Sequence, residues 1–178
     1  ECASMYHGAN RLGGNSLLAA IYSGHVAANA INTLAETKDC PNFETYISEQ
    51  EQVLEKRLQS KSRFSAVHVR HEIAKLLNDC LGITRTEEKL LEGIKSVDYY
   101  ISVSEKLIYD TDVSPYIGYS LQPMLLLARA ILTSALSRKE TRGSHIREDY
   151  PQRSDEFALG SVSNYKNGEH HISCIKED

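Results

Sequence analysis

The residues best able to bind and orient a small anion lie near the start of the chain, within residues 7–18. Arg11 carries a planar guanidinium that can hold a carboxylate through two parallel hydrogen bonds. Gly13 and Gly14 follow it, and an apolar run that predicts a helix begins directly after them. The free N–H groups and positive end of that helix can hold a second electron-rich group. The stretch therefore predicts a site for two anionic or electron-rich groups.

Neighbouring residues extend this candidate site. Asn15 or Ser16 is expected to cap the helix, and the N–H groups of Ser16 and Leu17 would then point toward a ligand. Simple capping without a ligand is the alternative interpretation. His7 is a candidate proton carrier or donor, although a lone histidine near a chain end is more often structural. Glu1 would suit a hydrogen bond to a ribose hydroxyl.

A second group of candidate residues lies in the charged segment 142–151, which lacks helical periodicity. Arg142, His145, Arg147 and Asp149 could include a catalytic His–acid pair. No nucleophile motif lies nearby, so a charged interdomain latch is the favoured interpretation. The four cysteines are scattered and form no C-x-x-C pair. The sequence therefore predicts no metal site.

Composition excludes several classes of partner. The chain has 178 residues and a formal net charge of −4, which argues against a broad electrostatic grip on nucleic acid. No apolar run approaches the roughly 20 residues that cross a bilayer. The most apolar stretch, residues 124–136, contains Arg129 and is better explained as a buried helix.

The hydrophobic pattern predicts a mainly α fold. Helices are expected at about residues 15–35, 43–59, 63–81, 84–109 and 119–139, with a short C-terminal β-hairpin around Asn167–Gly168. Thr84 and Glu87 fit a capping box, and Pro123 is expected in a first helical turn. The core should be an antiparallel bundle of three or four helices. The small residues of the first helix predict a tightly packed face, which a homodimer could cover.

Four stretches in the same order carry a family resemblance: residues 7–18, 82–90, 121–138 and 142–151. Together they resemble the succinate dehydrogenase/fumarate reductase flavoprotein family, which includes L-aspartate oxidase. The resemblance implies three parts: residues 1–38 as the end of the FAD-binding domain, with its helix; residues 39–140 as the helical bundle; and residues 141–178 as a closing motif and C-terminal extension.

The resemblance also implies roles for individual residues. Arg11, with His7 beside it, would bind the substrate. The cofactor would contact the residues that match the family's flavin-binding positions: Glu1, Asn15, Ser16 and Leu17. The implied parent is an FAD-dependent oxidoreductase that interconverts succinate and fumarate by hydride transfer to or from flavin. A fragment of L-aspartate oxidase is one alternative, and a non-catalytic helical interaction module is another from a different class.

Other parts of such an enzyme have no counterpart in this sequence. It contains no Gly-rich dinucleotide fingerprint, no capping domain and no match to the family's proton-donor arginine. We therefore expect this chain alone neither to retain FAD nor to turn over a C4-dicarboxylate. The implied partners are the upstream FAD and capping domains and an iron–sulfur subunit. The implied location is the cytoplasm, with membrane association through partner subunits.

Overall fold

The computed structural model describes residues 7–34, 42–59, 65–104 and 115–175. The chain divides into two compact units, residues 1–47 and 48–178. The first unit contains α1 (Asn15–Thr33), and α2 (Glu44–Leu58) spans the boundary. The second unit contains the remaining elements: α3 (Ala66–Leu81), α4 (Glu87–Val103), α5 (Pro115–Ser137), the short 3₁₀ helix η2 (Asp155–Phe157), β1 (Gly160–Lys166) and β2 (Glu169–Ile175).

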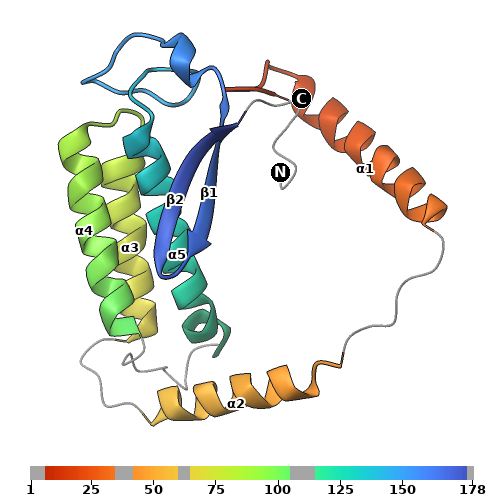
Figure 1. The fold of residues 1–178 in the computed structure, drawn as a ribbon, viewed down its shortest axis with the longest axis vertical. Helices are drawn as coiled ribbons and strands as arrows, with labels where there is room; N and C mark the ends of the chain where they lie inside the picture. Colours follow the sequence, from red (N-terminus) through yellow and green to blue (C-terminus); the bar gives the residue numbers. More distant parts are fainter. Residues whose placement is uncertain (1–6, 35–41, 60–64, 105–114, 176–178) are drawn as a thin grey trace. The chain divides into compact units, whose positions relative to one another are not determined.

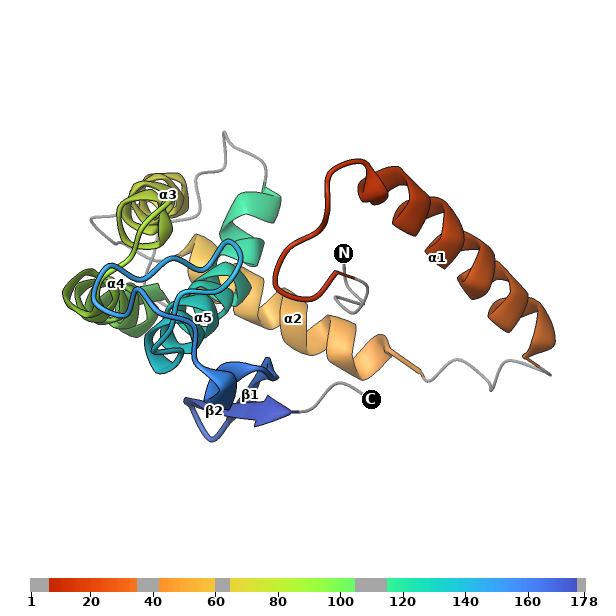
Figure 2. The ribbon, with the colours of Figure 1, turned by 90° about the horizontal axis from the view of Figure 1, so that it is seen from above.

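Helices α3, α4 and α5 form the body of the second unit. Each contacts the other two, and successive helices run in opposite directions (Figures 1 and 2). The hairpin β1–β2 packs along α5. The predicted fold class, a mainly α antiparallel bundle with a C-terminal hairpin, is confirmed.

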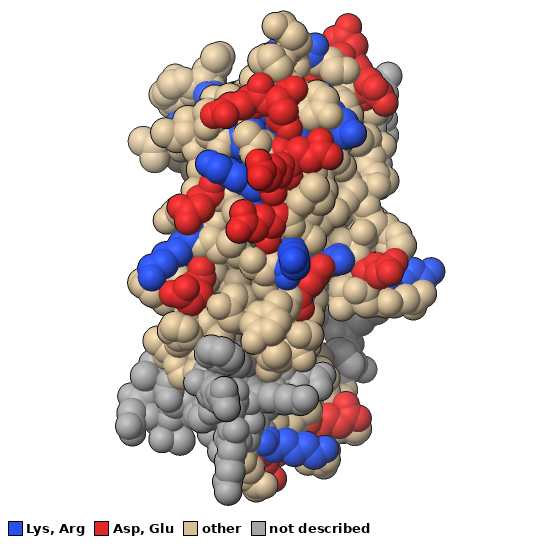
Figure 3. All heavy atoms as spheres, turned by 90° about the vertical axis from the view of Figure 1, so that its left-hand side faces the viewer, with Lys and Arg blue, Asp and Glu red and all other residues tan. Residues whose placement is uncertain are grey.

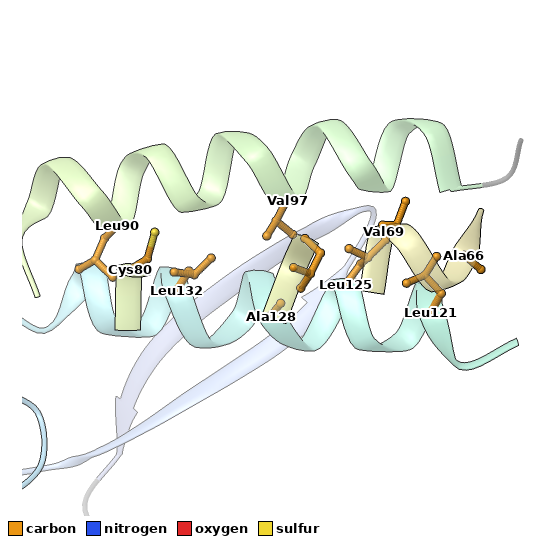
Figure 4. Packing of buried hydrophobic residues seen from close by; sticks show 10 residues of the cluster. Ala66, Val69, Cys80, Leu90, Val97, Leu121, Leu125, Ala128 and Leu132 are labelled. Carbon is orange, nitrogen blue, oxygen red and sulfur yellow. The ribbon is translucent and has the colours of Figure 1, made fainter. Parts of the chain in front are cut away.

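The core of the bundle comes from apolar side chains at three- and four-residue steps along the three helices. Figure 4 shows these side chains converging between α3, α4 and α5. Burying a large aliphatic side chain contributes about 1.5–3 kcal/mol, so this cluster supplies much of the stability of the bundle. The fully or almost fully buried members are Ala66, Val69, Ile73, Cys80, Leu90, Val97, Leu121, Leu125, Ala128 and Leu132.

Helix α4 lies close to both of its neighbours at Gly93. A Cβ atom built there would lie 3.0 Å from Sγ of Cys80 and 3.1 Å from a methyl carbon of Leu132. Both neighbours are buried. The missing side chain therefore lets α3, α4 and α5 pack closely at this level.

Two helix starts in the bundle use side-chain caps. Ser65 accepts a hydrogen bond from the N–H of His68 at the start of α3. Thr86 accepts one from the N–H of Lys89 at the start of α4. The prediction that Thr84 caps this helix was wrong, because helical geometry begins only at Glu87. The expected extension toward Tyr109 falls partly outside the described residues, and α4 ends at Val103.

Helix α5 begins at Pro115, four residues earlier than predicted, so Pro123 lies inside the helix rather than in its first turn. Proline at this position removes one backbone hydrogen bond. The helix is long and apolar enough to cross a membrane, with a mean hydropathy of 1.2 over its best window. Core helices can share that composition. Here α5 contributes Leu121, Leu125 and Leu132 to the core, while 22% of that window is buried among the described residues.

The C-terminal hairpin turns where the sequence predicted. Its seven paired positions run from Gly160 opposite Ile175 to Lys166 opposite Glu169. Between the strands, Asn167 and Gly168 have φ values of 53° and 85°. Two consecutive left-handed residues match the twist of antiparallel strands, which explains the Asn–Gly pair.

Candidate functional site

The charged segment after α5 forms a hydrogen-bonded cluster at one end of the bundle. At its centre, the side chain of Arg147 is completely buried. Nε and Nη2 of Arg147 donate to the two carboxylate oxygens of Asp149, each over 2.8 Å. This two-point pairing is the geometry that a guanidinium and a carboxylate favour.

Through this pair, Arg147 and Asp149 join the ends of two helices. Nη1 of Arg147 donates to three carbonyl groups at the end of α5, those of Ala135, Leu136 and Arg138. Oδ2 of Asp149 accepts the N–H of Glu87 at the start of α4. A cation therefore lies at a negative helix end and an anion at a positive one, as the helix dipoles favour.

The carboxylate of Glu140 organises the other half of the cluster. It is completely buried and accepts from Arg138 over 2.6 Å, from Arg142 over 2.8 Å and from the N–H of Ser154 over 2.9 Å. Burial alone would raise the pKa of Glu140, but these three donors outweigh it and lower the pKa to about 2. Glu140 therefore remains ionised and holds the two arginines together.

Both ring nitrogens of His145 have partners. Nε2 lies 3.1 Å from the carbonyl oxygen of Arg138, which can only accept, so Nε2 carries the proton. Nδ1 then accepts from Nη1 of Arg85 over 3.1 Å. Burial, followed by the charges of Arg85, Arg147 and Arg138, lowers the pKa of His145 despite the opposing hydrogen bond. His145 therefore stays neutral and links the α3–α4 connection to the end of α5.

Backbone pairing fixes the segment that carries these side chains. Arg142 and His145 exchange two hydrogen bonds around a tight turn, in which Gly143 has a φ of 58°. The N–H and carbonyl group of Arg85 pair with Ile146 and Glu148. The residue types of this segment were visible in the sequence, but its pairing with Arg85, which lies far away in the sequence, was not.

The geometry argues against one of the two interpretations of this segment, the catalytic His–acid pair. Asp149 pairs with Arg147 and not with His145, and both nitrogens of His145 are occupied. A catalytic His–acid pair is therefore not assembled. The hydrogen bonds of Arg142, His145, Arg147 and Asp149 within the described residues join parts of the second unit. Their interdomain role stays a prediction.

Sequence reasoning missed three members of the cluster. Arg85, Arg138 and Glu140 were not singled out, although each contributes a charged group to it. For Arg138 and Glu140, the signal was a charged pair placed directly after an apolar helix. For Arg85, the sequence offered only its place in the stretch that resembles the family.

The predicted ligand-binding residues lie in the first unit. Arg11 is exposed and forms no ion pair among the described residues, and His7 is half-buried. Asn15, Ser16 and Leu17 are exposed in the first turn of α1. Glu1 lies outside the described residues.

The start of α1 differs from the prediction in one respect. Gly14 occupies the capping position with a φ of 83°, and no side chain caps the helix, so neither Asn15 nor Ser16 is the cap. Cβ atoms added at Gly13 or Gly14 would meet nothing within 4 Å. The N–H of Asn15 donates to the carbonyl oxygen of Leu12 over 3.3 Å, and the following N–H groups of the first turn have no side-chain cap, as at a helix start that can take an electron-rich group.

The surface shows no segregation of charge on the face drawn in Figure 3. Acidic and basic side chains are interspersed over it. Among the described residues, no cluster of three or more His, Cys, Asp or Glu side chains has the arrangement of a metal site.

The second unit is thus a helical bundle closed at one end by an arginine–carboxylate cluster. Residues 70–176 match the family model described as "Fumarate reductase flavoprotein C-term". The chain therefore belongs to the succinate dehydrogenase/fumarate reductase flavoprotein family, and the predicted family resemblance is confirmed. This is a family of FAD-binding oxidoreductases.

Named relatives agree with this assignment. The chain is 30% identical over 168 residues to the succinate dehydrogenase flavoprotein subunit of Bacillus subtilis, covering 88% of this chain. It is 29% identical over 181 residues to the fumarate reductase flavoprotein subunit of Helicobacter pylori, covering 96% of this chain. It spans only 29% and 25% of the lengths of these two relatives.

The fold also matches solved structures. A chain of E. coli quinol fumarate reductase aligns with a TM-score of 0.73 at 24% identity. The alignment covers 96% of this chain and 31% of the other. This likeness supports the fold.

Proposed function

We propose that the parent of this chain is an FAD-dependent oxidoreductase that interconverts succinate and fumarate. Family membership over residues 70–176 carries the proposal. Relatives named as succinate dehydrogenase and fumarate reductase flavoprotein subunits support the choice of substrate pair. FAD would supply the hydride acceptor or donor.

Within that reaction, Arg11 would bind one carboxylate of the C4-dicarboxylate, with His7 as a second polar contact. Arg11 is exposed and has no carboxylate partner among the described residues, so its guanidinium is available. Fixing the dicarboxylate at one end orients its reacting carbons.

The start of α1 would contact the flavin. The uncapped N–H groups around Ser16 and Leu17, at the positive end of the helix, favour negative charge on a neighbouring group. Asn15 would contribute to the same contact, and Glu1 would bind another part of FAD. These side chains would bind and orient the dicarboxylate and the flavin, and none of them needs to transfer a proton.

The other parts of the machinery would come from the upstream FAD and capping domains. An iron–sulfur subunit is the proposed electron-transfer partner. We place the parent in the cytoplasm, at a membrane when its partner subunits bring it there. Neither the described residues nor the relatives support pairing of two copies through α1.

Two alternatives lead to different results. An L-aspartate oxidase would use the same arginine for L-aspartate, and a non-catalytic helical module would use no substrate. Succinate-dependent reduction of a dye and fumarate-dependent oxidation of a reduced viologen should therefore be measured with the full-length parent. We expect both activities, and we expect Arg11→Gln to lower kcat/KM by at least about 100-fold, the loss of one charge-assisted contact.

Arg11→Lys is the matched variant, since it keeps the charge but loses the two-point grip. Activity with L-aspartate alone would replace the proposal by the first alternative, and no activity with either substrate in an FAD-loaded parent would favour the second. For the 178-residue chain, gel filtration after addition of FAD should leave no flavin absorbance in the protein peak. Retention of stoichiometric flavin would contradict that part of the proposal.

A further inference from the structure

The polar cluster borders a pocket of about 450 Å³ that the proposed reaction does not use. It lies within the second unit, between the ends of α3 and α5, the 142–145 turn and β1. Its walls combine aliphatic surface with donor groups. The lining residues are Leu81, Arg85, Ile131, Ser134, Ala135, Arg138, Ser144, His145 and Ser161.

Three arginines of the cluster have carboxylate partners. Arg138 and Arg142 share Glu140, and Arg147 pairs with Asp149. Their positive charges are therefore largely offset within the cluster, and each pair contributes to holding the segment in place.

Arg85 differs from them because it forms no ion pair among the described residues. Nε and Nη2 donate to the carbonyl oxygen of Leu81, and Nη1 donates to that of Ser144 and to the neutral His145. Burial lowers the pKa of Arg85, and no carboxylate opposes this. A guanidinium remains charged in proteins regardless. The end of α3 supplies only about half of a compensating negative charge.

Donors for an incoming anion remain on the pocket walls. Arg85 has five N–H groups and uses four of them among the described residues, which leaves one on Nη2. Arg138 donates there only from Nη1 and Nη2, which leaves the N–H of its Nε. Ser134 and Ser144 line the same space.

We propose that this pocket is a binding site for a single carboxylate group on a short aliphatic stem. The carboxylate would pair with Arg85, and the stem would lie against Leu81 and Ile131, which line the pocket. One carboxylate matches one incompletely compensated guanidinium, whereas a dianion would leave excess negative charge in a half-buried site. The carboxylate comes either from a free small acid or from an acidic side chain of a neighbouring segment.

His145 provides the readout in the 178-residue chain. Its imidazole is titrated by NMR with and without butyrate, with butyramide as the uncharged analogue. A bound carboxylate should raise the titration midpoint of His145, because it offsets the nearby positive charge of Arg85. We expect the shift with butyrate and none with butyramide. Equal responses to both, or no response to any carboxylate tested, would overturn the proposal.

A capped glutamate, N-acetyl-glutamate amide, distinguishes the two sources. A response to butyrate alone indicates a free acid, and a response to the capped residue as well indicates a site that also accepts a protein side chain. Arg85→Gln should abolish the response, whereas Arg153→Gln, at an exposed arginine in the same C-terminal segment, should retain it.

Since Arg85 also supports the local structure, a second variant keeps the test decisive. Ile131→Glu places a carboxylate on the pocket wall at a position that is 43% exposed. It should raise the His145 midpoint without any added ligand and remove the response to butyrate. An unchanged midpoint together with a full butyrate response would contradict the site.

Discussion

The guanidinium of Arg147 and the carboxylate of Asp149 form a two-point ion pair that joins the end of α5 to the start of α4. The arginine is completely buried and also lies 4.9 Å from the centre of the Tyr150 ring. Two residues that are two positions apart therefore hold together the start of α4 and the end of α5, which are distant from each other in the sequence. The first two predictions concern this cluster.

Replacing Arg147 by methionine should destabilise the bundle strongly. The change leaves the Asp149 carboxylate and three carbonyl groups without their donor. Removing one partner of a buried ion pair costs about 3–5 kcal/mol. Urea unfolding of the variant, followed by circular dichroism, measures this cost.

Arg153→Met provides the control, since Arg153 is exposed and substitutions at such positions usually change stability by less than about 0.5 kcal/mol. Arg147→Lys should recover only part of the loss, because an ammonium cannot reproduce the two-point pairing. Equal stabilities of Arg147→Met and Arg153→Met would refute the role given to the pair.

Acid should weaken the same cluster. The hydrogen bonds from Arg147, helped by the N–H of Glu87, outweigh burial and lower the pKa of Asp149 to about 2. The pKa of Glu140 is also about 2 in the folded protein. Both groups have higher pKa values when unfolded, so their stabilising contribution is present above about pH 4.5 and is lost as the pH falls toward 2.

The free energy of unfolding in urea should therefore fall between about pH 5 and pH 3. Glu140→Gln should flatten this dependence, because the amide does not titrate. Glu169→Gln, at an exposed position of β2, should keep it. A stability that is constant across this range in the unmodified chain would be incompatible with the two lowered pKa values.

Substituting Gly93 by alanine should destabilise the bundle although alanine favours helices. The added methyl group would lie 3.0 Å from Sγ of Cys80 and 3.1 Å from Leu132. Overpacking costs about 1–3 kcal/mol, whereas the gain in helix propensity is about 1 kcal/mol. The net loss should be about 1 kcal/mol in urea unfolding.

Space made on the facing helix should rescue this variant. Cys80→Ala combined with Gly93→Ala should be more stable than the sum of the two single changes predicts. Gly24→Ala is the contrast, since nothing lies within 4 Å of a Cβ at that position of α1. Gly24→Ala should increase the helix content measured by circular dichroism. If the stability changes of Cys80→Ala and Gly93→Ala are simply additive in the double variant, the close contact between residues 80 and 93 is contradicted.

Replacing Gly168 by alanine should loosen the hairpin. The residue has a φ of 85°, which an L side chain adopts only with strain of about 1 kcal/mol or more. Amide hydrogen exchange of β1 and β2 should become faster, while that of α3 stays unchanged. Asn167→Gly is the matched variant, because glycine accepts the φ of 53° at that position, and its hairpin should remain protected.

The sequence by itself determined the helical content, most of the helix positions, the Asn–Gly hairpin and the family. Periodic apolar residues such as Val69, Ile73 and Leu90 reveal a helix and its buried face because the signal is local. The four ordered motifs revealed the family in the same way. Local patterns also predicted the start of α1, where the structure changed the identity of the capping residue, and the role of Arg11 stays a prediction.

Only the tertiary structure decided which groups the charged segment pairs with. From the sequence alone, Asp149 could have paired with His145. In the fold, Asp149 instead accepts from the start of α4 and from Arg147, and Arg147 also donates to the end of α5. Folding also brings Arg85 to His145, 60 residues further along the chain. Such pairings depend on which helix ends meet, and no local pattern records that, so the pocket beside Arg85 became visible only in the fold.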